Sequence, residues 1–170
     1  MKKDLTIIGG LFLLIVVIIV FGRQFTSGSL IGFASPQPAT KSASQKSTTT
    51  VTIGDLNIEA QIASTADKRK KGLSELDELP IANGMLFVFD KVGSYPIWMK
   101  DMKFPIDIIW IDDRKNIVDI AENALPEPGK KDKELKIYKP RADSKYILEI
   151  NAGLVRLHNL QIGETVSFTL

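Results

Sequence analysis

From residue 51 onward, the chain consists of short apolar stretches of strand length, separated by turn residues and charges. In residues 56–63, Leu, Ile, Ala and Ile alternate with polar residues, as they do in a strand with one buried face. Gly54-Asp55 supplies a turn just before this stretch, so residues 51–63 are predicted to form a β-hairpin. Further strands are predicted at 84–89, 95–99, 106–111, 117–120, 146–150 and 165–170.

Two short helical segments interrupt the strands. Ser64 and Thr65 offer an N-cap, the run Lys-Arg-Lys-Lys at 68–71 suits a helix C-terminus, and Gly72 is a natural stop. A helical turn is expected at 153–158. Many short strands with so little helix predict a mostly β fold of the β-rich α+β type. We expect a compact curled sheet or small barrel-like domain with one or two short helices.

Composition divides the chain into three predicted parts. Residues 1–22 are apolar behind a charged tip, and residues 23–50 are rich in Ser, Thr, Gly and Pro. The second part cannot bury enough apolar surface to offset its ordering entropy, which predicts a disordered tether. Residues 51–170 have the mixture of apolar runs, charges and turn residues that a single packed domain needs. Within this domain, residues 125–140 contain three prolines and are predicted to form a long exposed loop.

The first part is predicted to anchor the chain in a membrane. Residues 5–21 are 17 uncharged, mostly aliphatic residues that would span about 25 Å as a helix. Lys2 and Lys3 favour a cytoplasmic N-terminus, so a single-pass protein with its C-terminal domain outside the cytoplasm is expected. The alternative is a cleaved signal segment with Gly32 and Ala34 before the cut, which would make the domain secreted.

Charge and residue counts narrow the classes of function. The first 50 residues hold five Lys or Arg and one Asp, so 51–170 carry 17 basic and 19 acidic residues, and nucleic-acid binding is not expected. The absence of Cys excludes disulfides, thiolate metal sites and cysteine nucleophiles, and His158 is the only histidine. No glycine-rich phosphate loop is visible, so neither a cofactor nor a metal is predicted.

Two carboxylates stand out because they interrupt apolar strands. Asp107 lies in Ile-Asp-Ile-Ile-Trp-Ile and shares a face with Ile109 and Ile111, while Glu149 shares a face with Ile147 and Asn151. A carboxylate on an apolar face costs free energy unless it is paired or hydrogen-bonded. Each is therefore either a structural brace bonded to loop amides or a functional group. If both face one cavity, they could act as a catalytic acid and base.

Trp98 and Lys100 form a third candidate, because they project to the same side where a strand enters a loop. An aromatic floor beside an ammonium suits a sugar, a nucleobase or an anionic ligand. The alternative is that Trp98 belongs to the core, with Lys100 at the solvent edge. Weaker signals are interpreted as structural: His158 as a surface or capping residue, the basic run 68–71 as a solvated helix face, and Asp112-Asp113 as a turn.

The domain contains, in this order, the blocks Lys71-Gly72-Leu73, Gly84-Met85-Leu86-Phe87-Val88-Phe89, Trp98-Met99-Lys100-Asp101-Met102, Pro105 to Asp112, Leu148 to Gly153, and Gly163. In these blocks the sequence resembles the domain of unknown function 192 family of small bacterial and archaeal domains. The resemblance covers about residues 51–170 and implies a compact β-rich fold, with Asp107, Glu149 and Asn151 among the family's recurrent polar positions. The family often has an arginine a few residues after a Gly-Leu pair, where this chain has Glu75 and Leu76.

Three functions remain open from the sequence. The first is an extracytoplasmic, membrane-anchored binding or interaction module for an unknown small ligand or an envelope protein, with Trp98, Lys100, Asp107, Glu149 and Asn151 as candidate contacts. The second is a surface hydrolase that uses Asp107 and Glu149 as acid and base. The third is a purely structural envelope protein in which these carboxylates brace loops. Because no complete catalytic constellation is visible, the binding module is favoured.

Overall fold

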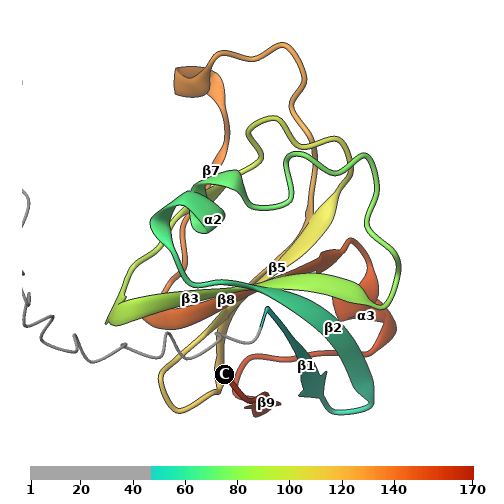
Figure 1. The fold of residues 1–170 in the computed structure, drawn as a ribbon, viewed down its shortest axis with the longest axis vertical. Coiled ribbons are helices and arrows are strands. Elements are labelled where there is room, and N and C mark those ends of the chain that lie inside the picture. Colours follow the sequence, from blue (N-terminus) through green and yellow to red (C-terminus); the bar gives the residue numbers. More distant parts are fainter. Residues whose placement is uncertain (1–46) are drawn as a thin grey trace, which may run out of the picture. The chain divides into compact units, whose positions relative to one another are not determined.

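A seven-stranded sheet in the order β6-β5-β8-β3-β2-β1-β9 dominates the computed structural model, which describes residues 47–170 (Figure 1). All neighbouring strands are antiparallel except β2 and β3, which are parallel and are connected through α2. The sheet strands are β1 (Thr48–Ile53), β2 (Leu56–Ala63), β3 (Asn83–Gly93), β5 (Ile106–Ile111), β6 (Ile117–Ala124), β8 (Ser144–Asn151) and β9 (Val166–Ser167).

The remaining elements are short. A two-stranded ribbon pairs β4 (Ile97–Trp98) with β7 (Ile137–Tyr138). The helices are α2 (Ala66–Lys71) and α3 (Leu154–Leu157), and a 3-10 turn, η1, covers Asp132–Glu134. The expected mostly β fold with a curled sheet and two short helices is therefore confirmed.

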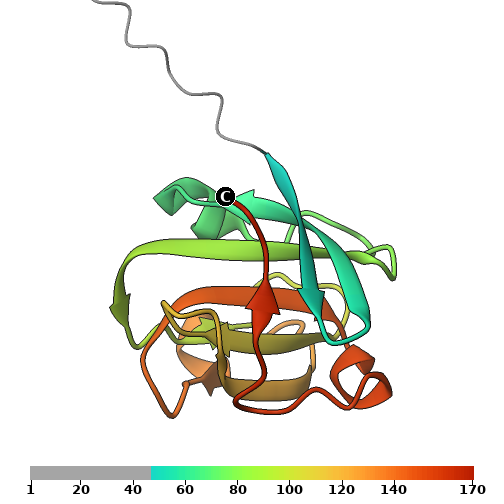
Figure 2. The same cartoon turned by 90° about the horizontal axis from the view of Figure 1, so that it is seen from below.

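The sheet curls until its two edge strands come together. β9 pairs with β1 at one edge, and Figure 2 shows these two strands side by side. At the other edge, the amide of Ile117 in β6 donates to the carbonyl of Glu164 at 2.8 Å. The amides of Gly163 and Val166 donate in return to the carbonyls of Ile117 and Lys115, both at 2.8 Å. These bonds satisfy backbone groups that an open sheet edge would leave unpaired.

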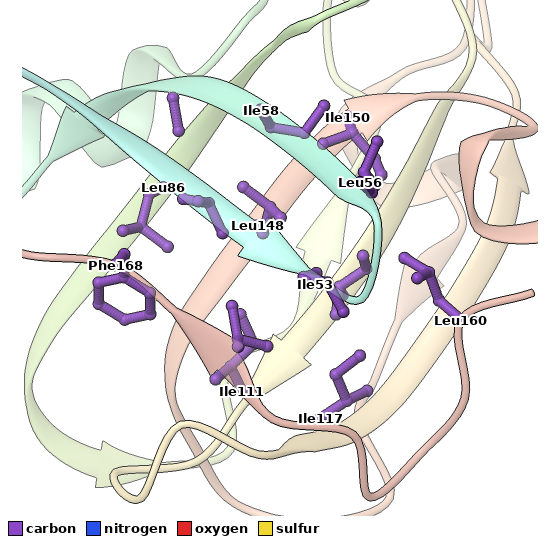
Figure 3. Close-up of a cluster of buried hydrophobic side chains, with 14 of the residues drawn as sticks. Ile53, Leu56, Ile58, Leu86, Ile111, Ile117, Leu148, Ile150, Leu160 and Phe168 are labelled. Atoms are coloured by element: carbon purple, nitrogen blue, oxygen red, sulfur yellow. The ribbon is translucent and has the colours of Figure 1, made fainter. Parts of the chain in front are cut away.

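Each face of the curled sheet carries a hydrophobic core. The inner core is drawn in Figure 3, where side chains from β1, β2, β3, β5, β6 and β8 meet α3 and the C-terminal segment. The outer core lies on the opposite face of the same strands and includes Phe87, Trp110 and Ile147. The strands alternate between the two cores: on β8, Ile147 belongs to the outer core, and Leu148 and Ile150 to the inner one.

The local signals read from the sequence account for α2. The side chain of Thr65 accepts a hydrogen bond from the amide of Lys68 at 3.3 Å, and Gly72 ends the helix with a φ of 53°. A left-handed φ of this kind is strained for residues with a Cβ, so glycine suits the stop. Both predicted ends of this helix are confirmed.

Some of the predicted elements differ from the structure. β3 continues beyond the predicted strand end at residue 89 as far as Gly93, with an irregularity in its pairing to β8 after Val88. The predicted strand at 95–99 is reduced to two residues after Pro96, which has no amide hydrogen to donate. The predicted loop at 125–140 contains η1 and β7, because β7 has β4 as a pairing partner far away in the sequence.

The predicted membrane anchor has to be corrected. In residues 47–170 no helix is long and apolar enough to cross a membrane. The longer of the two α-helices within this range has six residues, which span about 9 Å against a hydrocarbon core of about 30 Å. The predicted membrane partner and the predicted single-pass localisation both depend on residues 5–21. These residues lie outside the described part of the chain, as does most of the predicted tether.

Candidate functional site

A pocket of about 580 Å³ lies on the outer face of the sheet. Its walls come from the C-terminal part of α2 with the loop after it, from β3 and β8, and from the segment 95–102 that contains β4. Figure 1 shows α2 and β7, the partner strand of β4, together on one side of β3 and β8. Pockets of this size are typical of sites for small organic molecules.

Glu149 lies at the floor of this pocket. Its side chain projects from β8 to the outer face, only 5% of the residue is exposed, and it lines the pocket wall. Among residues 47–170, no group donates a hydrogen bond or a compensating charge to its carboxyl. Burial alone raises the pKa of Glu149 to about 8, because the charged form loses its hydration without gaining a partner.

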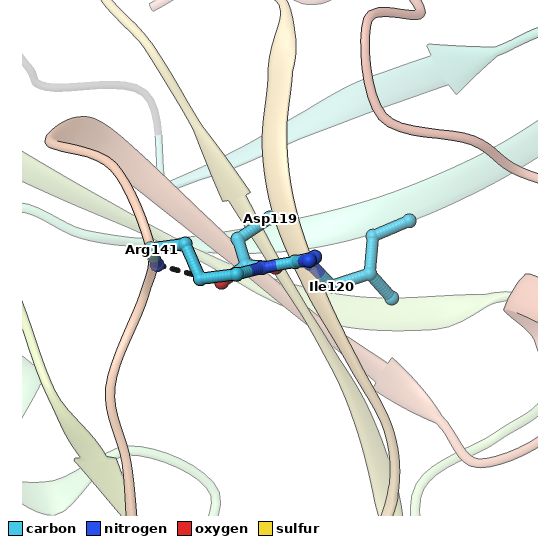
Figure 4. Close-up of polar contacts among 3 residues, drawn as sticks. All are labelled: Asp119, Ile120 and Arg141. Carbon is cyan, nitrogen blue, oxygen red and sulfur yellow. Dashed lines mark hydrogen bonds and ion pairs between the residues drawn. The ribbon is translucent and has the colours of Figure 1, made fainter.

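The other two buried carboxylates of the described domain are satisfied. Asp107 accepts hydrogen bonds from the amides of Asn123 (2.8 Å), Gly153 (2.9 Å) and Val155 (2.9 Å). Asp119 accepts bonds from the amides of Ile120 and Arg141 and from the Arg141 guanidinium, as Figure 4 shows. Glu149 is therefore the exception among the three, because its carboxyl has no hydrogen-bond partner in the described domain and reaches only the pocket.

The balance of effects at Asp119 is the opposite of that at Glu149. Burial acts to raise the pKa of Asp119, but the hydrogen bonds and charge of Arg141 outweigh it and lower that pKa below its usual value. The shortest of these bonds joins Arg141 Nη2 to Asp119 Oδ1 at 2.6 Å. The pair fixes the segment after β7 to β6 and lies outside the pocket lining.

Aromatic rings and a guanidinium form one side of the pocket. The rings of Phe89 and Tyr95 are stacked with centroids 3.6 Å apart. The guanidinium of Arg69 lies over Phe89, 5.0 Å from the ring centroid, and its Nη1 donates to the carbonyls of Ser64 (2.6 Å) and Val88 (2.9 Å). Arg69, Phe89 and Tyr95 all line the pocket.

Trp98 and Lys100 lie at the mouth of the same pocket. Trp98 is 49% exposed, so the alternative that it belongs to the core is wrong, and the buried tryptophan is Trp110. Lys100 Nζ lies 6.0 Å from the Trp98 ring centroid and 2.6 Å from a carboxylate oxygen of Asp132, which raises the pKa of Lys100. The predicted placement of Trp98 and Lys100 on one side is therefore observed.

The remaining candidates lie elsewhere. The register pairs Asp107 with Ile150 and Ile108 with Glu149, so the two carboxylates occupy opposite faces of the sheet. Asn151 donates to the carbonyls of Leu79 (2.9 Å) and Pro80 (3.1 Å) and thereby holds the loop before β3. His158 caps α3 and contacts Asp55 at 3.0 Å, in agreement with a capping role.

The sequence did not identify several pocket residues. The basic run at 68–71, which includes Arg69, is interpreted as a solvated helix face, and Phe89 and Tyr95 fall in two separate predicted strands. The sequence pattern did identify Trp98, Lys100 and Glu149 as candidates, and all three line the pocket. Within residues 47–170, no group of three or more His, Cys, Asp or Glu side chains could hold a metal ion.

A comparison with known protein families agrees with the resemblance that the sequence blocks indicate. The model of a family described as an uncharacterized ACR, DUF192, matches residues 49–168. The chain belongs to the DUF192 family. The family description names no activity. The resemblance inferred from the sequence blocks is confirmed.

Relatives of this DUF192 chain include two archaeal proteins. It is 28% identical over 109 residues to the UPF0127 protein TK1120 of Thermococcus kodakarensis, and 26% identical over 108 residues to a UPF0127 protein of Thermococcus gammatolerans. Each match covers 64% of this chain, and the chain spans 64% and 65% of the length of these relatives.

Two crystal structures share the fold with a TM-score of 0.63. One is a protein of Sinorhizobium meliloti described as a proposed transcription regulator, 25% identical, with 71% of this chain and 92% of that chain covered. The other is a protein of unknown function from Novosphingobium aromaticivorans, 26% identical, with 71% and 83% covered.

Proposed function

We propose that this DUF192 domain is a binding module that holds a small organic molecule in the pocket over Glu149. The observation that carries the proposal is the buried, unpartnered carboxyl of Glu149 in a cavity that is accessible from solvent. A ligand with a hydrogen-bonding group would supply the partner that the described residues of the protein do not give this carboxyl.

The lining supports a ligand with substantial apolar surface. Aromatic side chains of Phe87, Phe89, Tyr95 and Trp98 are distributed around the cavity, and Trp98 is half exposed at its mouth. Such rings provide large contact areas at a low entropic cost, since each has only two side-chain torsions. A few polar groups between them would fix the orientation of the ligand.

The experiment is a fragment screen of the full-length chain by ligand-observed NMR, with hits confirmed by calorimetry. Specific pocket binders are expected to lose at least about tenfold in affinity for Glu149→Gln or for Trp98→Ala, or about 1.4 kcal/mol. Glu78→Gln is the matched control, because Glu78 is exposed and lies outside the pocket lining. Hits that bind all variants equally, or a screen with no hits, would contradict the proposal.

The pKa of Glu149 supports a second candidate function, proton transfer to or from the bound molecule. A carboxyl with a pKa of about 8 holds its proton near neutral pH and releases it readily, as a general acid or base must. Asp107 cannot be the partner group, because it lies on the other face of the sheet. Incubation of confirmed ligands with the protein separates the two functions: unchanged ligand supports binding, and Glu149-dependent turnover supports catalysis.

A further inference from the structure

The two ends of the pocket differ in their chemistry. Glu149 pairs with Met85 across β8 and β3, and Phe89 lies four residues further along β3. Four residues of extended strand cover roughly 13 Å. Arg69 is stacked on Phe89, so its guanidinium and the Glu149 carboxyl lie toward opposite ends of the cavity rather than facing each other.

At the Arg69 end of the pocket, the guanidinium is held in a position suited to binding an oxyanion. Both hydrogen bonds that the side chain of Arg69 makes within residues 47–170 use Nη1, which holds the guanidinium in place against β3 and the start of α2. The edge formed by Nε and Nη2 has no partner there. This edge presents two parallel N–H groups, the geometry that a carboxylate accepts with both oxygens.

The charges around this end favour an anion over a cation. Lys70 and Lys71 line the pocket beside Arg69, and Lys71 pairs with Glu75 while Lys70 has no ionic partner in the described domain. Across the mouth, Lys100 is neutralised by Asp132. The pocket-lining carboxylate of Asp101 has no ion pair in the described domain, but it acts by charge on Lys100. The unpaired charges on the α2 side, next to the aromatic wall, are thus the positive ones of Arg69 and Lys70.

Between the two ends lies a flat apolar wall. The stacked rings of Phe89 and Tyr95 extend from the Arg69 end, and Phe87 continues the wall along β3 toward Glu149. An extended strand alternates its side chains, so Phe87 and Phe89 project to the same face as Met85. A planar body packs well against such a row of rings.

We infer that the ligand is an elongated organic carboxylate with a planar ring. Its acid group binds the free edge of Arg69, its ring packs on Phe87 and Phe89, and an uncharged hydrogen-bonding group at its far end meets the carboxyl of Glu149. This inference rests on the proposed binding function and narrows its ligand class.

A set of four probes of similar size tests each part of the inference by calorimetry on the full-length chain. 3-(4-Hydroxyphenyl)propionate has the acid, the ring and the far hydroxyl. Tyramine exchanges the acid for an ammonium, 4-propylphenol has no charge, and hexanoate has the acid without the ring. We expect the first probe to bind at least about tenfold more tightly than the other three.

Variants of Arg69 then test whether the acid group of the ligand binds at this side chain. Arg69→Gln is expected to remove most of the advantage of 3-(4-hydroxyphenyl)propionate over 4-propylphenol, and Arg69→Lys to restore part of it. Arg114→Gln is the matched control, because Arg114 is exposed on the turn before β6 and lies outside the pocket lining. Thermal unfolding of each variant checks that the fold is retained.

The outcomes separate the inference from the function on which it rests. Preference for tyramine, equal binding of the charged and uncharged probes, or no binding of any probe up to about 10 mM would overturn the anionic ligand class. Pocket binders of another class in the fragment screen would then leave the binding function standing. An acid preference that survives Arg69→Gln would overturn the assigned position of the acid group.

Discussion

Glu149 and Asp107 lie on adjacent strands, one register position apart, and yet face opposite sides of the sheet. Asp107 pairs with Ile150, and its carboxyl receives three amide hydrogen bonds next to α3. Glu149 pairs with Ile108, and its carboxyl lies in the pocket without a partner in the described domain. One carboxylate therefore braces the fold, whereas the other is available to a ligand.

Asp107→Asn is expected to lower the free energy of unfolding by about 2–4 kcal/mol. An asparagine has one acceptor oxygen, and its amide group would face amides that now donate to Asp107. Urea denaturation of the variant measures the loss. Affinity for pocket ligands should stay unchanged, and a loss of affinity without a loss of stability would assign Asp107 to the site.

Glu149→Gln is expected to change the pH dependence of stability. The folded pKa of about 8 lies above the ordinary value of 4.5, so the unfolded chain releases the proton first. The contribution of Glu149 is therefore fully favourable below pH 4.5 and is lost as pH rises toward 8, with a slope of up to about 1.4 kcal/mol per pH unit. Glu149→Gln removes this slope.

Urea denaturation of the wild type and Glu149→Gln at several pH values between about 4 and 9 checks this slope. The variant should be the more stable protein at the alkaline end, and the difference should shrink toward acid. Glu78→Gln again serves as the control. Parallel pH profiles for the wild type and Glu149→Gln would contradict an unpartnered, buried carboxyl.

Asp119→Asn is expected to have the opposite pH signature. Because Arg141 lowers the pKa of Asp119, the ion pair stabilises the fold above the ordinary pKa of 3.8, and this contribution is lost as pH falls through the folded pKa. The variant should lose about 1–3 kcal/mol at neutral pH and resemble the wild type in strong acid. Urea denaturation at neutral pH and in strong acid measures this loss of stability. An equal loss under both conditions would contradict a stabilising role for the charge of Asp119.

Gly84→Ala is expected to destabilise the sheet by about 2 kcal/mol or more. A Cβ at Gly84 would lie 2.7 Å from the carbonyl oxygen of Glu149 and 2.8 Å from Ile58 Cγ2. The matched control is Gly93→Ala on the same strand, where the new Cβ would make only ordinary contacts at 3.5 Å with the Tyr95 ring. Thermal unfolding compares the two, and similar effects would contradict the close packing at Gly84.

Much of the fold could be predicted from local patterns, because alternation, caps and turn residues act over a few positions. The hairpin around Gly54, the helix from Thr65 to Gly72 and the strand at 106–111 follow from such signals. The extension of β3 through residues 90–93 and the pairing of β4 with β7 do not. Both depend on partners that are distant in sequence.

The candidate site was partly predictable for the same reason. Glu149 attracted attention as a carboxylate in an apolar strand, and Trp98 with Lys100 as an aromatic next to a cation. Arg69 was not recognisable, since its role depends on Phe89 lying beneath it. The assignment of Asp107 and Glu149 to different faces required the register of β5 and β8, which a single sequence does not contain.

The most direct test of ligand binding over Glu149 is a crystal structure of the full-length chain soaked with 3-(4-hydroxyphenyl)propionate. We expect electron density for one molecule in the pocket, with its acid group at the Nε and Nη2 edge of Arg69 and its hydroxyl at the carboxyl of Glu149. A pocket that stays empty under soaking, while crystals of the chain diffract well, would contradict the proposed ligand and its binding site. So would a probe bound only at another surface.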